Sequence, residues 1–486
     1  MAGLAIPAGL IQRSGMKPQR QVRLDYRRFG RFNGQHVTEM PQFKIASQRI
    51  VELHELLMAG KDDMLKDKDV VMTGWKMDSP FIADTELEKI QKAAQKLAAE
   101  IEDFVSIGIG GSYLGIQATI DAVKGSLDLT NLLDRIGRGG TPRIFFLGHN
   151  MDPAYTARVL EIMKGRRAGG VVISKSGGTV EPAIAFAIFK NGMDASFSEK
   201  EVQERIIAVT DKAKGALKEL AIAQGYSTYV VPDNVGGRYS VTCPVGLFAL
   251  AISGVNIKEF IAGARAAENM VRSQPFDKNI AMLRAAMRFM AHRYMGKVTE
   301  LASTGVYDLR SVSMWMQQLG PESEGKQGEG LLIVPQYYTR EAHADGQLVQ
   351  QGPRNLIETF LMVEQPETDV IIPGQGTPVE YLDGKGLHFA NTAFVEGLRD
   401  AHYEGGVPTM SFLLSELNAF TIGMLYQFEM NAIALSGLLL DQNPFIQPGV
   451  QQYKNVANAR SGKPGTEAAL AQMQAAEGKL NPDFIV

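Results

Sequence analysis

Cysteine and long apolar runs are scarce in this chain of 486 residues, and both features restrict the cellular compartment in which we expect the protein. The one cysteine, Cys243, cannot form an internal disulfide or build a cysteine-cluster metal site, so we expect a reducing compartment, the cytoplasm. No stretch holds the ~18 uninterrupted apolar residues that a membrane helix needs. The most apolar segment, residues 418–440, is interrupted by Gln427, Glu429 and Asn431 and therefore predicts a buried helix.

A strong excess of charge is also missing. The formal net charge of -3 argues against broad nucleic-acid binding, which usually requires a basic surface, and favours a small-molecule ligand. Residues 13–31 are locally basic, with Asp25 as the one acidic residue. We expect a solvated or partner-contacting arm there, and an organelle transit peptide is the alternative. The apolar start is a poor secretory signal, because no basic residue precedes it and Pro7 interrupts it.

Motifs for metals, nucleotides and dinucleotides are absent as well. The seven histidines include no pair four residues apart with an intervening glutamate, so no metal site is expected. No Gly-Lys pair is followed by Ser or Thr, which excludes a P-loop. The turn "SIGIGGSYLG" fails the dinucleotide fingerprint because Tyr113 stands where a third glycine is needed. We therefore expect no cofactor.

What the sequence does contain is a regular alternation of helical and strand patterns. Continuously apolar strands such as "DFVSI", "PRIFFL", "GGVVIS" and "RIIAVT", separated by amphipathic helices, predict a parallel sheet covered on both faces. A second alternation follows with "KVTELAST", "GEGLLIVPQ" and "TDVIIPG", interleaved with expected helices at Val312–Leu319 and Asn355–Met362. The run Gly384–Glu404 is too mixed to assign. The fold class is α/β, and the expected parts are an N-terminal arm with helices (1–83), a first domain (84–255), a second domain (256–457) and a tail (458–486).

The stretch "VVISKSGGTVEP", Val171–Pro182, follows an apolar strand with hydroxyls and glycines. A strand that turns into a helix here places free backbone N–H groups and hydroxyls where they can hold a phosphate. An ordinary capped turn is the alternative, and these residues alone do not decide between them. The turn "GIGGS" offers Gly110, Gly111 and Ser112 in the same way, and two such turns at the carboxyl ends of parallel strands can face one crevice.

Four further clusters mix charge with glycine: "DNVGGRYSVTCPVG", "QQLGPESEGKQGEG", "EAHADGQLVQQGPRN" and "DQNPFIQPGVQQYKN". Each alone is typical of a surface loop. Together with the two turns, in this order from about Asp103 to Lys454, they resemble the phosphoglucose isomerase family. The resemblance implies two domains of the sugar-isomerase (SIS) type, each a mainly parallel sheet flanked by helices. It also implies an enzyme of glycolysis and gluconeogenesis that interconverts glucose 6-phosphate and fructose 6-phosphate.

The resemblance also implies site residues. Arg238 in "GGRYS" matches the family's active-site arginine, Glu322 in "GPESEGK" its base, and His343 and Lys454 its histidine and lysine. The residues implied in substrate binding are Gly111, Ser112, Ser174, Lys175, Ser176, Thr179, Gln318 and Gln447. Two positions depart from the family pattern: Cys243 stands where a small or hydroxyl residue is usual, and Gln451 replaces a glutamate beside Lys454.

The chemistry of the implied reaction suits these residue types. A carboxylate at Glu322 can move a proton between C2 and C1 through a cis-enediolate, and the permanent cation of Arg238 can stabilise the negative oxygen. His343 and Lys454 are the candidates for ring opening. Family members are dimers in which this histidine reaches the neighbouring subunit's site, so a homodimer with shared active sites is expected.

Two alternatives stay open at this point. The enzyme could also accept mannose 6-phosphate, because pocket shape rather than a motif sets that choice. The chain could instead be a catalytically silent module that binds sugar phosphates, as other proteins of this fold are. Such a module needs the phosphate turns but no base, so the presence of Glu322, Arg238, His343 and Lys454 favours the enzyme.

Overall fold

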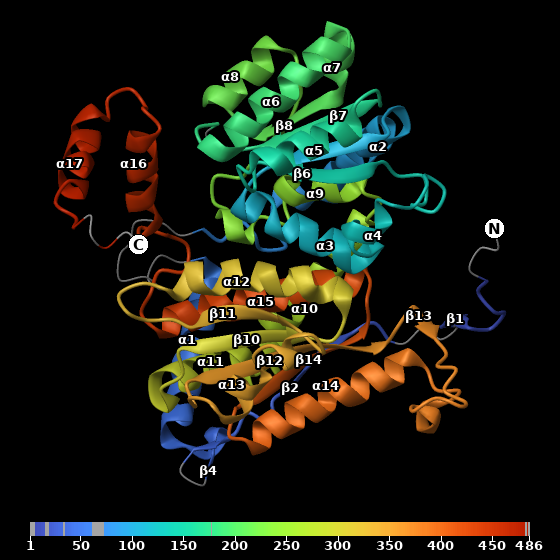
Figure 1. The fold of residues 1–486 in the computed structure, drawn as a ribbon. Coiled ribbons are helices and arrows are strands. Elements are labelled where there is room, and N and C mark those ends of the chain that lie inside the picture. The colour runs from blue at the N-terminus through green and yellow to red at the C-terminus, as the bar shows by residue number, and fades with distance from the viewer. Residues whose placement is uncertain are drawn as a thin grey trace. The chain divides into compact units, whose positions relative to one another are not determined.

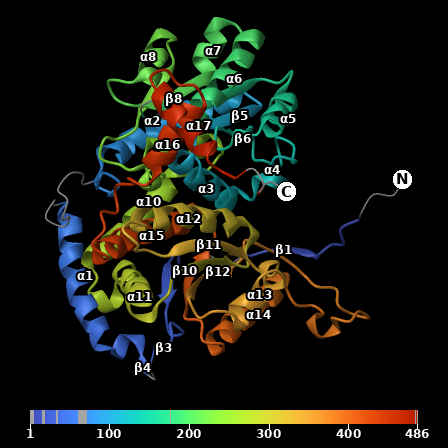
Figure 2. The same cartoon turned by 60° about the vertical axis from the view of Figure 1, so that its left-hand side comes forward.

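A computed structural model describes residues 5–14, 19–32, 35–60, 72–175, 177–481 and 484 of the chain. The chain divides into two compact units, residues 1–444 and residues 445–486. The larger unit contains two five-stranded sheets and their helices, which Figures 1 and 2 show from two sides. The boundaries expected after residues 83, 255 and 457 stay predictions.

The first sheet is entirely parallel and has the strand order β6-β5-β7-β8-β9. Every residue of the central strands is buried, which explains why these strands are continuously apolar rather than alternating. The strand segments expected from the sequence are confirmed here. Their bounds are β5 Asp103–Ile107, β6 Arg143–Leu147, β7 Ala168–Ile173, β8 Ile206–Thr210 and β9 Ser227–Val230.

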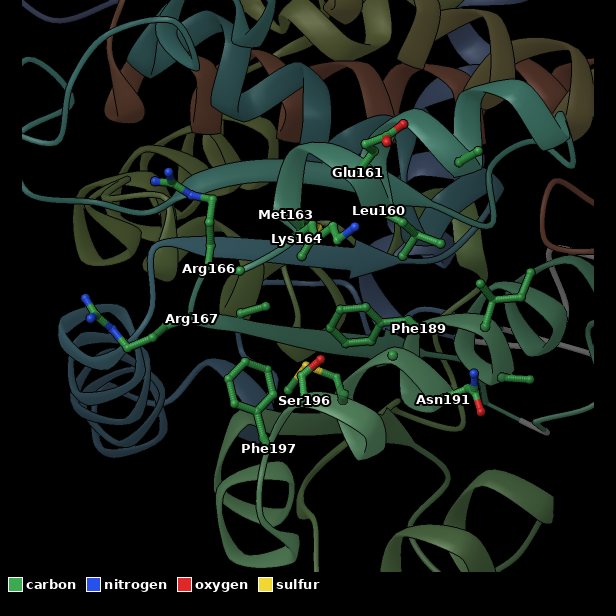
Figure 3. Close-up of a pocket in the computed structure, with 17 residues that line it drawn as sticks. Leu160, Glu161, Met163, Lys164, Arg166, Arg167, Phe189, Asn191, Ser196 and Phe197 are labelled. Carbon is green, nitrogen blue, oxygen red and sulfur yellow. The ribbon is translucent and has the colours of Figure 1, made fainter.

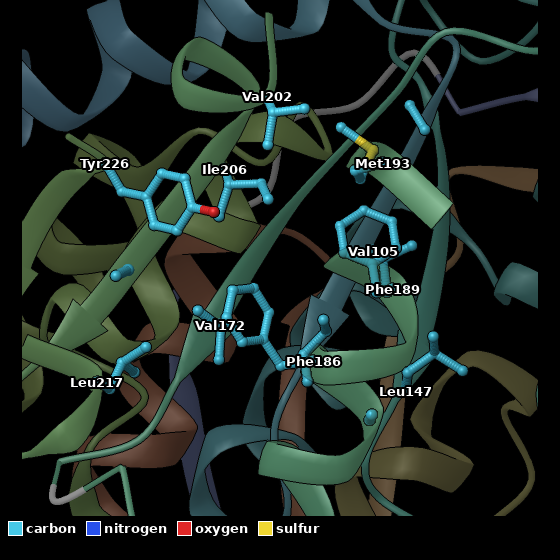
Figure 4. Packing of buried hydrophobic residues seen from close by; sticks show 14 of the residues in the cluster. Val105, Leu147, Val172, Phe186, Phe189, Met193, Val202, Ile206, Leu217 and Tyr226 are labelled. Carbon is cyan, nitrogen blue, oxygen red and sulfur yellow. The ribbon is translucent and has the colours of Figure 1, made fainter. Parts of the chain in front are cut away.

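Helices cover both faces of this sheet (Figure 1). On one face, side chains of α5–α8 pack with strand residues such as Val105 and Val172 into a buried cluster around Phe186 and Phe189 (Figure 4). The opposite face carries α2, α3 and α9. The bounds are α2 Asp84–Glu100, α3 Leu114–Lys124, α4 Leu127–Thr130, α5 Pro153–Met163, α6 Val180–Ser196, α7 Glu199–Arg205, α8 Ala216–Ala223 and α9 Pro244–Ile252.

The second sheet has the order β11-β10-β12-β14-β2, in which the first four strands are parallel and β2 is antiparallel. Because the chain runs from β10 to β11 in one direction and from β11 to β12 and β14 in the other, right-handed crossovers place α12 on one face and α13 and α14 on the other (Figure 1). The bounds are β2 Val22–Asp25, β10 Thr299–Thr304, β11 Leu332–Tyr337, β12 Leu356–Gln365, β14 Thr409–Glu416, α12 Arg310–Glu324, α13 Gly346–Gln351 and α14 Leu387–Glu404. The α/β class with mainly parallel sheets is confirmed.

Three details differ from the expectation. The helix predicted at Asn355–Met362 is wrong, because this segment forms β12, whose first eight residues are all buried. A strand that is buried on both faces lacks the alternation of apolar and polar residues by which it could be told from a helix. "TDVIIPG" does contain a strand, β13 Thr368–Val370, but it pairs with β1 Ile11–Arg13 outside the second sheet. The unassigned run Gly384–Glu404 contains α14.

Part of the basic N-terminal segment joins the second sheet as β2, while its arginines Arg20, Arg23 and Arg27 stay exposed. Val22 is buried, and β2 pairs with β14 at the edge of the second sheet. Arginines of this segment form ion pairs with acidic residues of the same chain, including Arg20 with Glu259 and Arg28 with Asp400. The short strands β3 Arg31–Phe32 and β4 Gln35–His36 follow, and then α1 Pro41–Ala59.

The buried helix expected at residues 418–440 is confirmed as α15 Ala419–Leu439. It packs with α10 Ile257–Ser273 and α11 Ile280–Met295, while Tyr426 stacks on Trp315 of α12 and hydrogen-bonds Thr119 of α3. None of the helices in the described part of the chain combines the length and apolar character that crossing a bilayer requires. The smaller unit contains α16 Val450–Arg460 and α17 Glu467–Glu477.

Candidate active site

The two glycine-rich turns lie at the carboxyl ends of neighbouring strands. The first turn, Gly110–Ser112, joins β5 to α3, and the second, residues 174–179, joins β7 to α6. Because β5 and β7 pair in parallel, both turns emerge at one edge of the sheet, each before a helix N-terminus. Free N–H groups at such ends attract anions. A phosphate-binding site at the carboxyl ends of the strands requires this arrangement.

The second turn is held by its own side chains. The backbone N–H of Gly177 donates to the hydroxyl of Ser174 over 3.1 Å. Thr179 precedes α6 as its N-cap residue, yet its side chain makes no capping hydrogen bond, so the hydroxyl is not committed to the helix. The ammonium of Lys175 lies 3.1 Å from the carboxylate of Asp233. Ser176 lies outside the described residues.

Gly111 brings the first turn against the segment that carries Arg238. A Cβ atom on Gly111 would stand 1.9 Å from the carbonyl oxygen of Gly237, far inside van der Waals contact. Only glycine therefore allows the two backbones to approach this closely. The same approach sets Arg238 beside the expected phosphate turn.

Arg238 is buried, with 1% of its side chain exposed, and its guanidinium is held from several sides. Nε donates to Oγ of Ser323 over 2.8 Å, and Nη2 donates to the carbonyl of Pro444 over 2.6 Å. Nη1 lies 3.4 Å from Oε2 of Glu322. The hydroxyl of Tyr239 also contacts Oγ of Ser323, at 3.1 Å. A buried cation held in this way acts as a fixed positive charge at the site.

Glu322 lies in the last turn of α12 and keeps 24% of its side chain exposed. Gln318, one helical turn earlier, donates from Nε2 to Oε2 of Glu322 over 3.1 Å. The same nitrogen would lie 2.9 Å from a Cβ added to Gly110, so Gln318 also borders the first glycine-rich turn. The predicted base, the predicted arginine and this turn therefore meet.

A buried network of charges anchors the end of α12. Glu324, two residues after Glu322, accepts from Nη2 of Arg288 over 2.6 Å. Arg288 also pairs with Glu300, which pairs with Arg284, and Arg284 reaches Glu429 at 2.8 Å. Breaking one member of such a buried set leaves an uncompensated charge, so the network resists movement of the helix end.

Three predicted residues are not part of this cluster in the larger unit. His343 is exposed and follows the carboxyl end of β11, whereas Glu322 precedes the start of β11. β11 has six residues, so its ends lie roughly 20 Å apart at about 3.3 Å per residue. Gln447 and Lys454 belong to the unit of residues 445–486, in which Lys454 lies on α16.

The structure adds residues that the sequence reasoning did not single out. Ser323 and Tyr239 support Arg238, and Asp233 pairs with Lys175. The ammonium of Lys326 donates to the carbonyl oxygens of Glu322 and Ser323. Position was the available signal, because Ser323 and Lys326 belong to the motif "GPESEGK" and Tyr239 follows Arg238.

A cavity of about 980 Å³ lies elsewhere, between α5 and α6 at the start of β7 (Figure 3). Leu160, Phe189, Met193 and Phe197 line it, with Lys164 nearby. It lies at the amino end of β7, whereas the glycine-rich turns lie at the carboxyl ends of the strands, so it is separate from the cluster around Glu322. Within the described ranges, no group of three or more His, Cys, Asp or Glu residues could hold a metal ion.

The sequence is similar to a known family and to named proteins. The family model described as phosphoglucose isomerase matches residues 32–368. A glucose-6-phosphate isomerase of Symbiobacterium thermophilum is 42% identical over 406 residues, which cover 83% of this chain and 89% of that protein. The glucose-6-phosphate isomerase of Pediococcus pentosaceus is 39% identical over 438 residues, covering 89% of this chain and 96% of its own length.

Solved structures agree on the fold. A hypothetical protein from Thermus thermophilus is similar with a TM-score of 0.78 and 28% identity, covering 91% of this chain and 100% of its own. A glucose-6-phosphate isomerase from Chlamydia trachomatis has a TM-score of 0.74 at 22% identity, covering 94% of this chain and 92% of its own. The glycine-rich turns, the arginine and the glutamate thus stand in a chain whose relatives match over most of its length, and the chain belongs to the phosphoglucose isomerase family.

Proposed function

We propose that this protein is a glucose-6-phosphate isomerase, which interconverts glucose 6-phosphate and fructose 6-phosphate and so works in glycolysis and gluconeogenesis. The observation that carries the proposal is the approach of Arg238 to Glu322, 3.4 Å apart, beside the glycine-rich turn that Gln318 borders. A protein that only bound sugar phosphates would need the turns but neither of these groups. The names of the relatives support the same activity.

The phosphate group of the substrate is proposed to bind at the two turns. Backbone N–H groups before α3 and α6, with the hydroxyls of Ser112, Ser174, Ser176 and Thr179, supply donors to its oxygens. Gly111 lets the backbone approach closely, and Lys175 adds positive charge at the rim. Gln318, which lies between the first turn and Glu322, would then face the sugar between its phosphate and its reacting carbons.

The chemistry follows from the groups at the other end. In the open-chain aldose, the carboxylate of Glu322 removes the proton from C2, the C–H electrons form the C1–C2 double bond, and the carbonyl oxygen on C1 becomes negative. Arg238 stabilises this cis-enediolate. The hydroxyl proton on the C2 oxygen then passes to the C1 oxygen, and the C2 oxygen becomes the new carbonyl while C1 takes the abstracted proton back from Glu322, which regenerates the carboxylate. No electron leaves or enters the substrate overall.

Ring opening is assigned to His343 and Lys454, and the proposal includes a homodimer with shared active sites. The roughly 20 Å length of β11 separates His343 from Glu322 in one chain, which supports a site completed by His343 of a second copy. Gln447 is assigned to substrate binding near Lys454. A cytoplasmic location is proposed from the one cysteine, Cys243, which is buried and unpaired.

The test is a coupled assay that follows glucose 6-phosphate formed from fructose 6-phosphate by the purified protein. Glu322→Gln should lower kcat by about 10²- to 10⁴-fold, the usual contribution of a general base, and leave KM nearly unchanged. Glu329→Gln is the matched control, because Glu329 lies seven residues further on and pairs with His292 and Arg293 instead. Folded wild-type protein that converts no substrate would exclude the proposed activity.

A further inference from the structure

Lys326 lies directly behind the proposed base without being part of the reacting cluster. Its ammonium donates to the carbonyl oxygen of Glu322 over 3.3 Å and to the carbonyl oxygen of Ser323. Its backbone N–H donates to the carbonyl of Glu324 over 2.7 Å. One residue therefore holds three successive carbonyls at the end of α12.

These carbonyls need such a partner. The last four carbonyls of a helix have no N–H within the helix to bond, and they form the negative end of the helix dipole. Glu322 lies in this same turn. A cation on the carbonyls of Glu322 and Ser323 offsets that field and stops the last turn from fraying.

We infer that Lys326 is a positioning residue for the isomerase reaction: by bonding the carbonyls of Glu322 and Ser323, it fixes the peptide that carries the base and holds the carboxylate toward the substrate. The inference rests on the proposed function of the site. It assigns no contact between Lys326 and the substrate, because the ammonium points at the backbone of α12.

The surroundings of Lys326 make the protonation of its ammonium group sensitive to pH. Burial, together with the positive charge of Arg238, lowers the pKa of Lys326 to about 8, while the carboxylates of Glu324 and Glu322 act in the opposite direction. Arg238 comes from the segment after β9, and both glutamates come from α12. Above about pH 8 the ammonium loses a proton, its charge and one donor, and its hold on the helix end weakens.

The experiment compares wild type with Lys326→Met, which keeps the length but not the charge, and Lys326→Arg, which keeps a cation that does not titrate in this range. Initial rates in the isomerase assay give kcat and KM at pH values from about 6 to about 10. Lys297→Met is the matched control, because the ammonium of Lys297 is buried and also donates to a backbone carbonyl, that of Arg354 rather than one of α12.

We expect Lys326→Met to lower kcat roughly ten- to a hundredfold while KM changes little, as the loss of a charge-assisted bond at the base predicts. Lys326→Arg should recover much of this loss and move the alkaline fall of kcat, near pH 8 in the wild type, to higher pH. Lys297→Met should lower the melting temperature without altering the kcat profile.

Wild-type kcat in Lys326→Met would overturn the inference, and so would an alkaline limb that Lys326→Arg leaves in place. Should Lys326→Met fail to fold, the pH profile of Lys326→Arg decides by itself. An inactive wild type would instead reject the proposed function, so the two failures are distinguishable.

Discussion

The guanidinium of Arg238 and the carboxylate of Glu322 approach to 3.4 Å although the segments that carry them are connected to different sheets. Arg238 follows β9 of the first sheet, and Glu322 lies between β10 and β11 of the second. Each is placed by its own environment: Arg238 by Ser323 and the carbonyl of Pro444, and Glu322 by the last turn of α12. The site thus depends on how the two α/β halves pack, and its variants should report on that packing as well as on chemistry.

Arg238→Lys keeps the positive charge but cannot reproduce the planar set of donors to Ser323 and Pro444. We expect kcat to fall by about 10²-fold, the scale of losing one stabiliser of a negative intermediate, with a smaller change in KM. Arg265→Lys, which alters a surface arginine paired with Asp84, is the control. Near-normal kcat in Arg238→Lys would show that charge alone is sufficient at this position.

Thr179→Ala tests the second glycine-rich turn. The Thr179 side chain does not cap α6, so its removal should leave the fold unchanged and act on phosphate binding. Loss of one charge-assisted hydrogen bond predicts a rise in KM of roughly ten- to a hundredfold at constant kcat. Thr156→Ala is the control, because this hydroxyl donates to the carbonyl of Asp152, the N-cap residue of α5. An unchanged KM would show that the Thr179 hydroxyl does not bind the phosphate.

Gly111→Ala should separate the two backbones that meet at the site. The new Cβ would stand 1.9 Å from the carbonyl oxygen of Gly237, and relief requires backbone movement. We expect a loss of about 1–3 kcal/mol in the free energy of unfolding, the usual scale of overpacking, and a lower kcat/KM. Gly397→Ala on the exposed side of α14 meets no atom and should be neutral or stabilising. Equal behaviour of the two variants in urea unfolding would contradict the close approach.

The sequence predicted the elements whose signal is local. Apolar runs between amphipathic helices were enough to place β5–β8, and the glycine-rich turns marked the edge where phosphate is proposed to bind. It failed at β12, because a strand buried between β10 and β14 on both faces shows no alternation of apolar and polar residues to read. Motifs selected Arg238 and Glu322, which do meet. The contact of Gly111 with Gly237 could not be predicted, because it depends on how two segments distant in sequence pack together. The bonds of Lys326 could not be predicted either, because they depend on the exact conformation at the end of α12.

Asp121 predicts a pH dependence of stability at the contact between α3 and α12. Its buried carboxyl accepts from the hydroxyl of Ser311 and from the N–H of Leu127, and burial raises its pKa to about 6. The pKa in an unfolded chain is about 3.9. The folded state therefore binds the proton more tightly, and the stabilisation present below about pH 4 is lost as pH rises through 6.

Asp121→Asn removes this titration while keeping an acceptor for Leu127 and a donor toward Ser311. The free energy of unfolding of wild type relative to the variant should fall by roughly 2 kcal/mol between about pH 4 and about pH 7. Urea unfolding at both pH values measures the difference. A difference that stays constant with pH would show that Asp121 does not titrate in this range.

The last prediction concerns which chain supplies His343 to a site. Glu322→Gln and His343→Ala are prepared separately, each expected to be nearly inactive, and are then unfolded, mixed and refolded together. In a two-fold hybrid with shared sites, one site receives both substitutions and the other receives Glu322 from one chain and His343 from its partner. Random pairing makes about half of the dimers hybrids with one intact site each, so the mixture should recover about a quarter of wild-type activity. Giving the two variants different tags and isolating dimers that carry both tags confirms that hybrids form. If those dimers are inactive, His343 serves the site of its own chain, and the separation of the two residues along β11 must be closed by a movement within one subunit.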